Sequence, residues 1–276
     1  MESLTRIVDA FKFQEQIAER LKEATNLSID ISKLIRNAIN ESLQGINEYD
    51  WPALFKETED DMIVFKFAIV SMGYPPPHSM DIPTMRMIAN SYKEDKEYTK
   101  SIIDQLMVDY YNDEVIEIIH DSWEAKEILK KRIHILRKVI MGYKLGFHDL
   151  VIPTLLAQFE GLLVDCFKID DNVGGKIISA LLEELLLKDS NAEWDFDEAI
   201  HYYYTKNLLA TFKHGKKLKS LISRNAILHG ADIKYGIAQN SIKVILLFDY
   251  IVHCLEDISE ETISKGQERV EEIRLK

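Results

Sequence analysis

The segment from Ile242 to Leu255 is apolar on almost every side of a helix, and this feature constrains the fold most. A helix that is apolar all round must lie buried among other elements. Asp249 interrupts the segment, which also falls short of the roughly 20 residues needed to cross a bilayer. We therefore expect a central buried helix, and a chain of 276 residues is long enough to surround it.

Helical spacing also dominates the rest of the chain. In 145–167 the apolar residues follow the i, i+3, i+4, i+7 rule, whereas strand-like alternation bounded by turn residues is nearly absent. The chain has only 11 glycines and 6 prolines. These patterns predict an all-α fold. The expected helices lie near 4–24, 27–44, 51–72, 81–93, 95–109, 113–144, 147–168, 173–188, 196–213, 216–229 and 240–257, followed by a charged tail helix.

The clearest break is Gly73–His78, which contains three consecutive prolines. Proline ends a helix and favours an extended backbone. We predict an N-terminal helical region, 1–110, and a C-terminal helical bundle, 111–276.

The composition limits the cellular setting. Only Cys166 and Cys254 are present, both in apolar runs, so neither a disulfide framework nor a cysteine-based zinc site is expected. The first residues lack a signal-peptide pattern. We expect a cytoplasmic protein without a membrane segment. We also expect no cofactor and no metal, neither at an HExxH zinc site nor at a Glu-x-x-His di-metal site.

The charge is distributed unevenly. The formal net charge is −12, yet no Asp or Glu occurs between Ala199 and Ala231. That window contains six basic residues, so it attracts anions that the rest of the chain repels. A solvated basic helix face is the simpler reading, but the cluster adjoins Arg224 and His229. The residues predicted to contact RNA are Lys213, Lys216, Lys217 and Lys219.

Within this window, Ser223–Gly230 is the candidate active centre. On an uninterrupted helix, Arg224 and His229 would point about 140° apart, so they could not converge on one phosphate. Asn225 and His229 share a face. Gly230 suits the position just after a helix, so we expect the helix to end at His229, where the macrodipole favours an imidazolium.

This arrangement resembles the HEPN superfamily, whose signature is an arginine followed, after four to six residues, by a histidine. Here the signature is Arg224–His229, with an apolar helix after it. Upstream, Leu155–Leu163 resembles the Gln/Glu-Gly segment of the preceding bundle helix in related bacterial proteins, many of which belong to phage-defence or toxin systems. The resemblance covers roughly residues 115–260.

The resemblance implies a metal-independent endoribonuclease. Arg224 would bind the scissile phosphate, and Asn225 would orient the phosphate or the histidine. His229 would act as general acid or base in attack by the ribose 2′-hydroxyl. The products would be a 2′,3′-cyclic phosphate and a 5′-hydroxyl. It also implies a homodimer with a composite site, which would bring an arginine and a histidine from different chains together. An antitoxin or another regulatory protein is a further partner class.

The chain departs from the family in two ways. The toxins paired with nucleotidyltransferase antitoxins carry Tyr two residues after the histidine, whereas this chain has Ala231. Residues 1–110 match no catalytic module.

A non-catalytic alternative remains open. Glu160 faces the apolar side of its helix and needs a partner, for which Arg224 is the best candidate. Glu160 therefore either supports catalysis or forms a purely structural pair. In the second case the chain would be a helical module that binds RNA, a nucleotide or a protein. We further expect His253 to be a core residue, and His214 to contact phosphate or to lie idle on the surface.

Overall fold

The computed structural model describes residues 51–187, 196–216, 218, 220 and 222–275. The chain divides into two compact units, Met1–Phe55 and Lys56–Lys276. Its described residues form helices and no strand, which confirms the all-α prediction. The helices expected near 4–24 and 27–44 lie outside the described residues, and the division at 110/111 stays a prediction.

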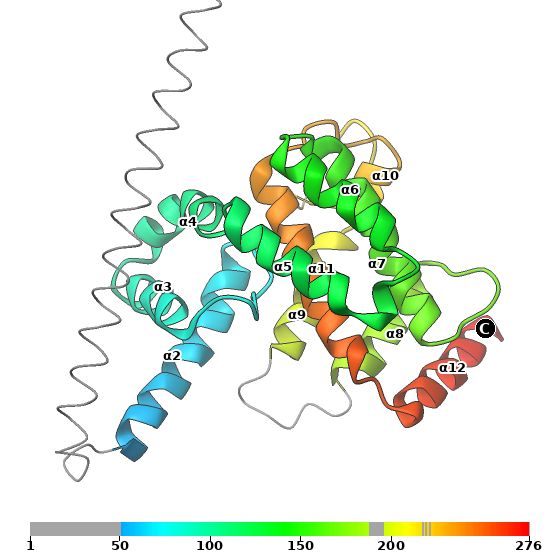
Figure 1. Cartoon of the computed structure of the whole chain (residues 1–276), viewed down its shortest axis with the longest axis horizontal. Coiled ribbons are helices and arrows are strands. Elements are labelled where there is room, and N and C mark those ends of the chain that lie inside the picture. Colours follow the sequence, from blue (N-terminus) through cyan, green and yellow to red (C-terminus); the bar gives the residue numbers. More distant parts are fainter. Residues whose placement is uncertain (1–50, 188–195, 217, 219, 221, 276) are drawn as a thin grey trace, which may run out of the picture. The chain divides into compact units, whose positions relative to one another are not determined.

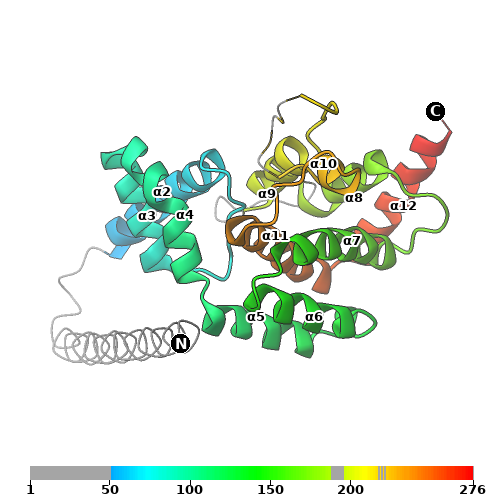
Figure 2. The same cartoon turned by 90° about the horizontal axis from the view of Figure 1, so that it is seen from above.

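Figure 1 and Figure 2 show the helices of the described residues in chain order. They are α2 (Trp51–Ser71), α3 (Ile82–Glu94), α4 (Lys96–Tyr110), α5 (Asp113–Ala125), α6 (Ile133–Lys144), α7 (His148–Cys166), α8 (Gly175–Leu187), α9 (Asp197–Tyr203), α10 (Arg224–Leu228), α11 (Ala238–Glu256) and α12 (Glu260–Arg274). None of these helices has the length and apolar character of a membrane-spanning segment.

Helix α11 is the centre of the unit, as predicted. Every residue from Asn240 to Val252 is buried, together with Leu255. It packs against α4, α7 and α8, and in Figure 2 it lies between the α2–α4 group and α7. Helix α7 packs in turn against α6, α8, α10 and α11, so a residue on α7 can reach several elements.

Side-chain caps and turn residues explain several helix ends. Asp81 and Asp95 accept hydrogen bonds from the backbone N–H groups of Thr84 and Tyr98, which caps α3 and α4. Helix α2 ends at Ser71, and Gly73 then adopts a φ of +84° ahead of the three prolines. The helix end predicted here is confirmed.

The single helix predicted over 113–144 is wrong. Helix α5 ends at Ala125, a 3-10 turn (η2, Glu127–Leu129) follows, and α6 begins at Ile133. Leu129 is fully buried by this turn. The break also allows Arg132 to bond across to α7. Tertiary packing therefore overrides the helical propensity of this charged segment.

The helices predicted over 196–213 and 216–229 are shorter in the structure. The first continues from α9 into a π-helical turn (η3, Tyr204–Leu208), and the described residues from 210 to 216 are not helical. Among the described residues of the second, only the five of α10 are helical. The candidate motif thus lies on one short helix between irregular segments.

Candidate active site

The ion pair between Glu160 and Arg224 anchors α10 to α7. The Arg224 Nη2 donates to Glu160 Oε2 at 2.6 Å, and the two side chains are only 23% and 20% exposed. Charge-assisted bonds of this kind are about twice as strong as neutral ones. The partner predicted for Glu160 from its position on an apolar helix face is confirmed.

Asn225 completes this group. Its Oδ1 accepts from Arg224 Nη1 at 3.0 Å. The Arg224 Nε is buried and has no hydrogen-bond partner among the described residues. Arg224 is therefore held at two nitrogens and retains one unsatisfied buried donor, which is costly unless water or a ligand satisfies it.

His229 lies at the opposite end of α10, where the chain turns. Gly230 has a φ of +69°, its N–H bonds to the Ile227 carbonyl, and the Ala231 N–H bonds to the Ala226 carbonyl. These bonds form a Schellman motif, which ends a helix with a left-handed residue. The helix end predicted at His229 is confirmed. The side chain of His229 is exposed.

Arg224 and His229 do not contact each other in the described residues. They are the first helical residue and the C-cap of α10, about 7.5 Å apart along the axis at 1.5 Å per residue. The helix end does not remove the divergence of the two side chains: Arg224 bonds to α7, whereas the His229 ring stacks on Phe212 with centroids 6.0 Å apart.

Phe212 was not singled out by the sequence pattern. It belongs to the segment between η3 and α10, and its ring also meets the His214 ring edge-on at 5.1 Å. Ser223, the N-cap of α10, donates to the Ala210 carbonyl at 2.9 Å and accepts from the Ala226 N–H. This serine ties the start of the segment to the start of α10.

The lysines of the basic window are exposed where the structure describes them. Lys206, Lys213 and Lys216 are exposed, and none has an ion-pair partner among the described residues. Lys217 and Lys219, the other two predicted RNA contacts, lie outside the described residues. The described ammonium groups are thus available to an anion.

Tyr204 is a site residue that the motif analysis missed. Its ring stacks on Phe159 at 5.1 Å. Burial raises the pKa of its hydroxyl, Glu160 raises it further, and Arg224 opposes both. The hydroxyl has no hydrogen-bond partner among the described residues. Tyr204 therefore forms an apolar wall beside the ion pair, and its position in a Tyr202–Tyr204 run was the only sequence signal.

A second arginine packs on another face of α7. Arg132 donates to Gln158 Oε1 and Asp165 Oδ2, each at 2.8 Å. A Cβ on Gly161 would lie 2.8 Å from both its Nη atoms. The Gln158–Gly161 segment, which carries part of the family resemblance, thus contacts both arginines. Gln158 bonds to Arg132, and Gly161 leaves room for the Arg132 guanidinium. Glu160 bonds to Arg224.

His253 is not a core residue, contrary to prediction, because it lies on the exposed face of α11. Its ring stacks on His78 at 5.0 Å. His78 Nε2 in turn lies 3.5 Å from Oδ2 of buried Asp249, which accepts from Trp123 Nε1 at 2.8 Å. This cluster explains how the apolar run tolerates an aspartate.

Contrary to expectation, Glu117 and His120 have Glu-x-x-His spacing, and with Asp121 their ligand atoms lie within 4.8 Å of one another. Lys144 pairs with Glu117, however, and His120 lies 3.3 Å from Glu124, which pairs with Arg137. These cations pair with Glu117, a member of the group, and with its neighbour Glu124. The group therefore fits an exposed ion-pair network better than a metal site.

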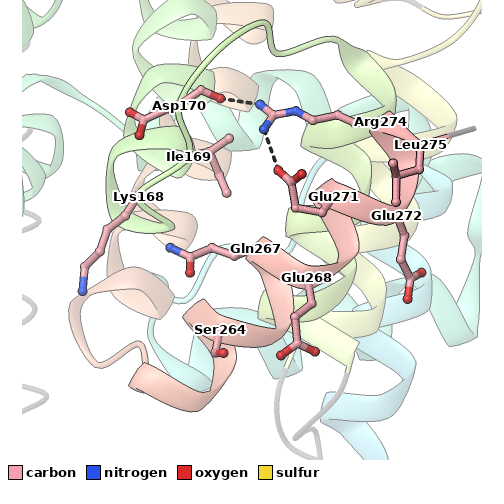
Figure 3. A pocket seen from close by; sticks show the side chains of 10 residues that line it. All are labelled: Lys168, Ile169, Asp170, Ser264, Gln267, Glu268, Glu271, Glu272, Arg274 and Leu275. Atoms are coloured by element: carbon pink, nitrogen blue, oxygen red, sulfur yellow. Dashed lines mark hydrogen bonds and ion pairs between the residues drawn. The ribbon is translucent and has the colours of Figure 1, made fainter.

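A pocket of about 650 Å³ lies between the turn after α7 and α12 (Figure 3). Arg274 closes one side of it by bonding to Glu271 and the Asp170 carbonyl. Glu268 and Glu272 also line it, and none of the predicted site residues does. Its acidic lining does not suit a polyanion.

No protein-family model matches this chain, and no curated protein or solved structure matches it either.

Proposed function

We propose that the chain is a metal-independent endoribonuclease with a HEPN-like helical bundle, acting in phage defence or a toxin-like role. The observation that carries this proposal is the arrangement of α10. Its first residue, Arg224, is fixed to Glu160 of α7, and its C-cap, His229, presents an exposed imidazole. Both lie in a window of the chain that contains no acidic residue.

The residues take distinct roles in this proposal. His229 transfers a proton during attack by the 2′-hydroxyl. Arg224 stabilises the negative charge that develops on the phosphate, with Asn225 and Glu160 holding its guanidinium. Lys213 and Lys216, with Lys217 and Lys219, attract the RNA backbone. The expected products are a 2′,3′-cyclic phosphate and a 5′-hydroxyl.

A homodimer is part of the proposal. Arg224 and His229 point to different partners within one chain, so a second copy of α10 would supply the missing group. Light scattering on the purified protein tests this directly. A strict monomer that cleaves RNA would contradict the composite site.

One observation favours a second candidate, a non-catalytic helical module. Arg224 is already committed to Glu160 and Asn225, and its third nitrogen, Nε, is buried. A purely structural arginine has these properties. Under this reading, substitution of Arg224 would destabilise the fold, and no RNA would be cleaved.

RNA cleavage in the presence of EDTA separates the two candidates. Wild-type protein should produce cyclic-phosphate ends, and His229→Ala should lower the rate by on the order of 10²–10⁴-fold. His134→Ala is the matched control, because His134 is exposed on α6. Equal cleavage by wild type and His229→Ala would disprove the assignment, and so would the absence of cleavage of every RNA tested.

A further inference from the structure

Two exposed histidines flank one aromatic ring beside the motif. The Phe212 ring stacks on His229, with 23° between the ring planes, and meets His214 edge-on at 73°. The two imidazoles are therefore no further apart than the sum of the two centroid separations, 5.1 and 6.0 Å. Phe212 is half-buried, whereas both histidines are exposed.

The surroundings of this pair suit a phosphodiester. Lys213 and Lys216 flank His214 in the chain and are exposed. Ser223 bonds to the Ala210 carbonyl, so the segment that carries His214 starts at the N-terminus of α10. His229 occupies the other end of the same helix. Both imidazoles and the exposed lysines thus lie close to one aromatic ring, on the same exposed part of the site.

The proposed reaction requires two proton transfers. The 2′-hydroxyl loses a proton as its oxygen forms a bond to phosphorus. The bond from phosphorus to the 5′-oxygen breaks, and that oxygen keeps the electron pair and gains a proton. A neutral imidazole can accept the first proton and an imidazolium can donate the second, so two histidines serve both steps at once.

We propose that His214 is the second acid–base residue of this centre, acting opposite His229. The inference rests on the proposed ribonuclease function and extends it. No oxidant, metal or co-reactant is consumed. The two rings exchange protonation states during cleavage, and proton exchange with water restores them.

The test uses His214→Ala, His229→Ala and the control His134→Ala in the full chain, with circular dichroism to verify folding. With an oligoribonucleotide in EDTA, His214→Ala should lower kcat by on the order of 10²–10⁴-fold and change KM little. It should also remove one limb of the bell-shaped pH profile. An unchanged kcat, or a change in KM alone, would overturn the proposal and leave His214 as a surface or phosphate-contacting residue.

A second substrate checks the division of roles. When sulfur replaces the bridging 5′-oxygen, the leaving thiolate needs no proton, so loss of the general acid becomes harmless. This substrate should restore one of the two histidine variants and not the other. Rescue of both, or of neither, would overturn the proposal. If wild-type protein cleaves neither substrate, the proposed ribonuclease function itself fails, which is a distinct outcome.

Discussion

Glu160 and Arg224 lie 64 residues apart in the chain and are joined by a 2.6 Å hydrogen bond between α7 and α10. This bond is the main charged link between the short helix and the bundle. Because both side chains are largely buried, removing either one leaves the charge of the other without a partner, which costs more free energy than breaking a surface ion pair.

A double-mutant cycle with Glu160→Gln and Arg224→Gln measures that dependence. Each single substitution leaves a buried charge without its partner, so each should destabilise the protein by about 1–3 kcal/mol. The double variant should lose less than the sum, with a coupling of about 0.5–3 kcal/mol in urea unfolding. Strictly additive losses would show that the two side chains are not energetically coupled, which would contradict the prediction.

Gly161→Ala should destabilise the protein although alanine is the better helix former. Helix propensity alone would stabilise by up to about 1 kcal/mol. The new Cβ would meet the Arg132 guanidinium at 2.8 Å, however, and displace it from Gln158 and Asp165. Thermal unfolding of Gly161→Ala in wild-type and Arg132→Met backgrounds separates the two effects. The same substitution should become neutral or stabilising once Arg132 is absent.

The Asp249 cluster should make stability depend on pH. Burial raises the pKa of Asp249 to about 6, against the hydrogen bond from Trp123 and the charge of Lys126. Its protonated form therefore stabilises the fold at low pH, and this contribution is lost as the pH rises through about 6. Burial also lowers the pKa of His78 to about 4, so its stabilising contribution is lost as the pH falls through about 4.

Asp249→Asn should remove the loss of folding stability at high pH. An asparagine amide can still accept a hydrogen bond from Trp123, and it does not ionise. Relative to wild type, the variant's unfolding free energy should rise by on the order of 1 kcal/mol between pH 5 and pH 8. The exposed Asp121→Asn is the control and should show no such trend. Parallel pH curves for Asp249→Asn and wild type would contradict the prediction.

Gly230 should be replaceable by asparagine but not by alanine. Its φ of +69° is left-handed, which costs most residues about 1 kcal/mol or more. Asparagine tolerates this region better. Gly230→Ala should lower the melting temperature and the cleavage rate, while Gly230→Asn should retain most of both. Similar losses for the two variants would mean that the turn does not depend on the φ angle of residue 230.

The sequence predicts some of this structure well and some of it poorly, for physical reasons. The burial of α11 follows from its apolar residues alone. The N-termini of α3 and α4 follow from the capping residues Asp81 and Asp95. The break after Ala125 has no such signal, because residues 126–132 contain neither glycine nor proline. The helix is interrupted there, where Leu129 packs into the core and Arg132 hydrogen-bonds to α7.

The candidate site shows the same division. The partnership of Glu160 with Arg224 was predictable, since a carboxylate on an apolar helix face requires a cation. The contacts of Phe212 with His214 and His229 were not, because they arise in a non-helical segment whose path no periodicity describes. The wall formed by Tyr204 likewise depends on a π-helical turn that the residue pattern does not reveal.

The shortness of α10 has a consequence for how the site responds to heat and to ligands. In the described part of the chain between Leu209 and Ala238, this five-residue helix is the one regular element. Local opening of a segment with few helical hydrogen bonds costs less free energy than unfolding of the whole fold. Amide hydrogens around Arg224 and His229 should therefore exchange faster than those of α11 and slow down when RNA binds. Activity should be lost on warming before the bundle itself melts.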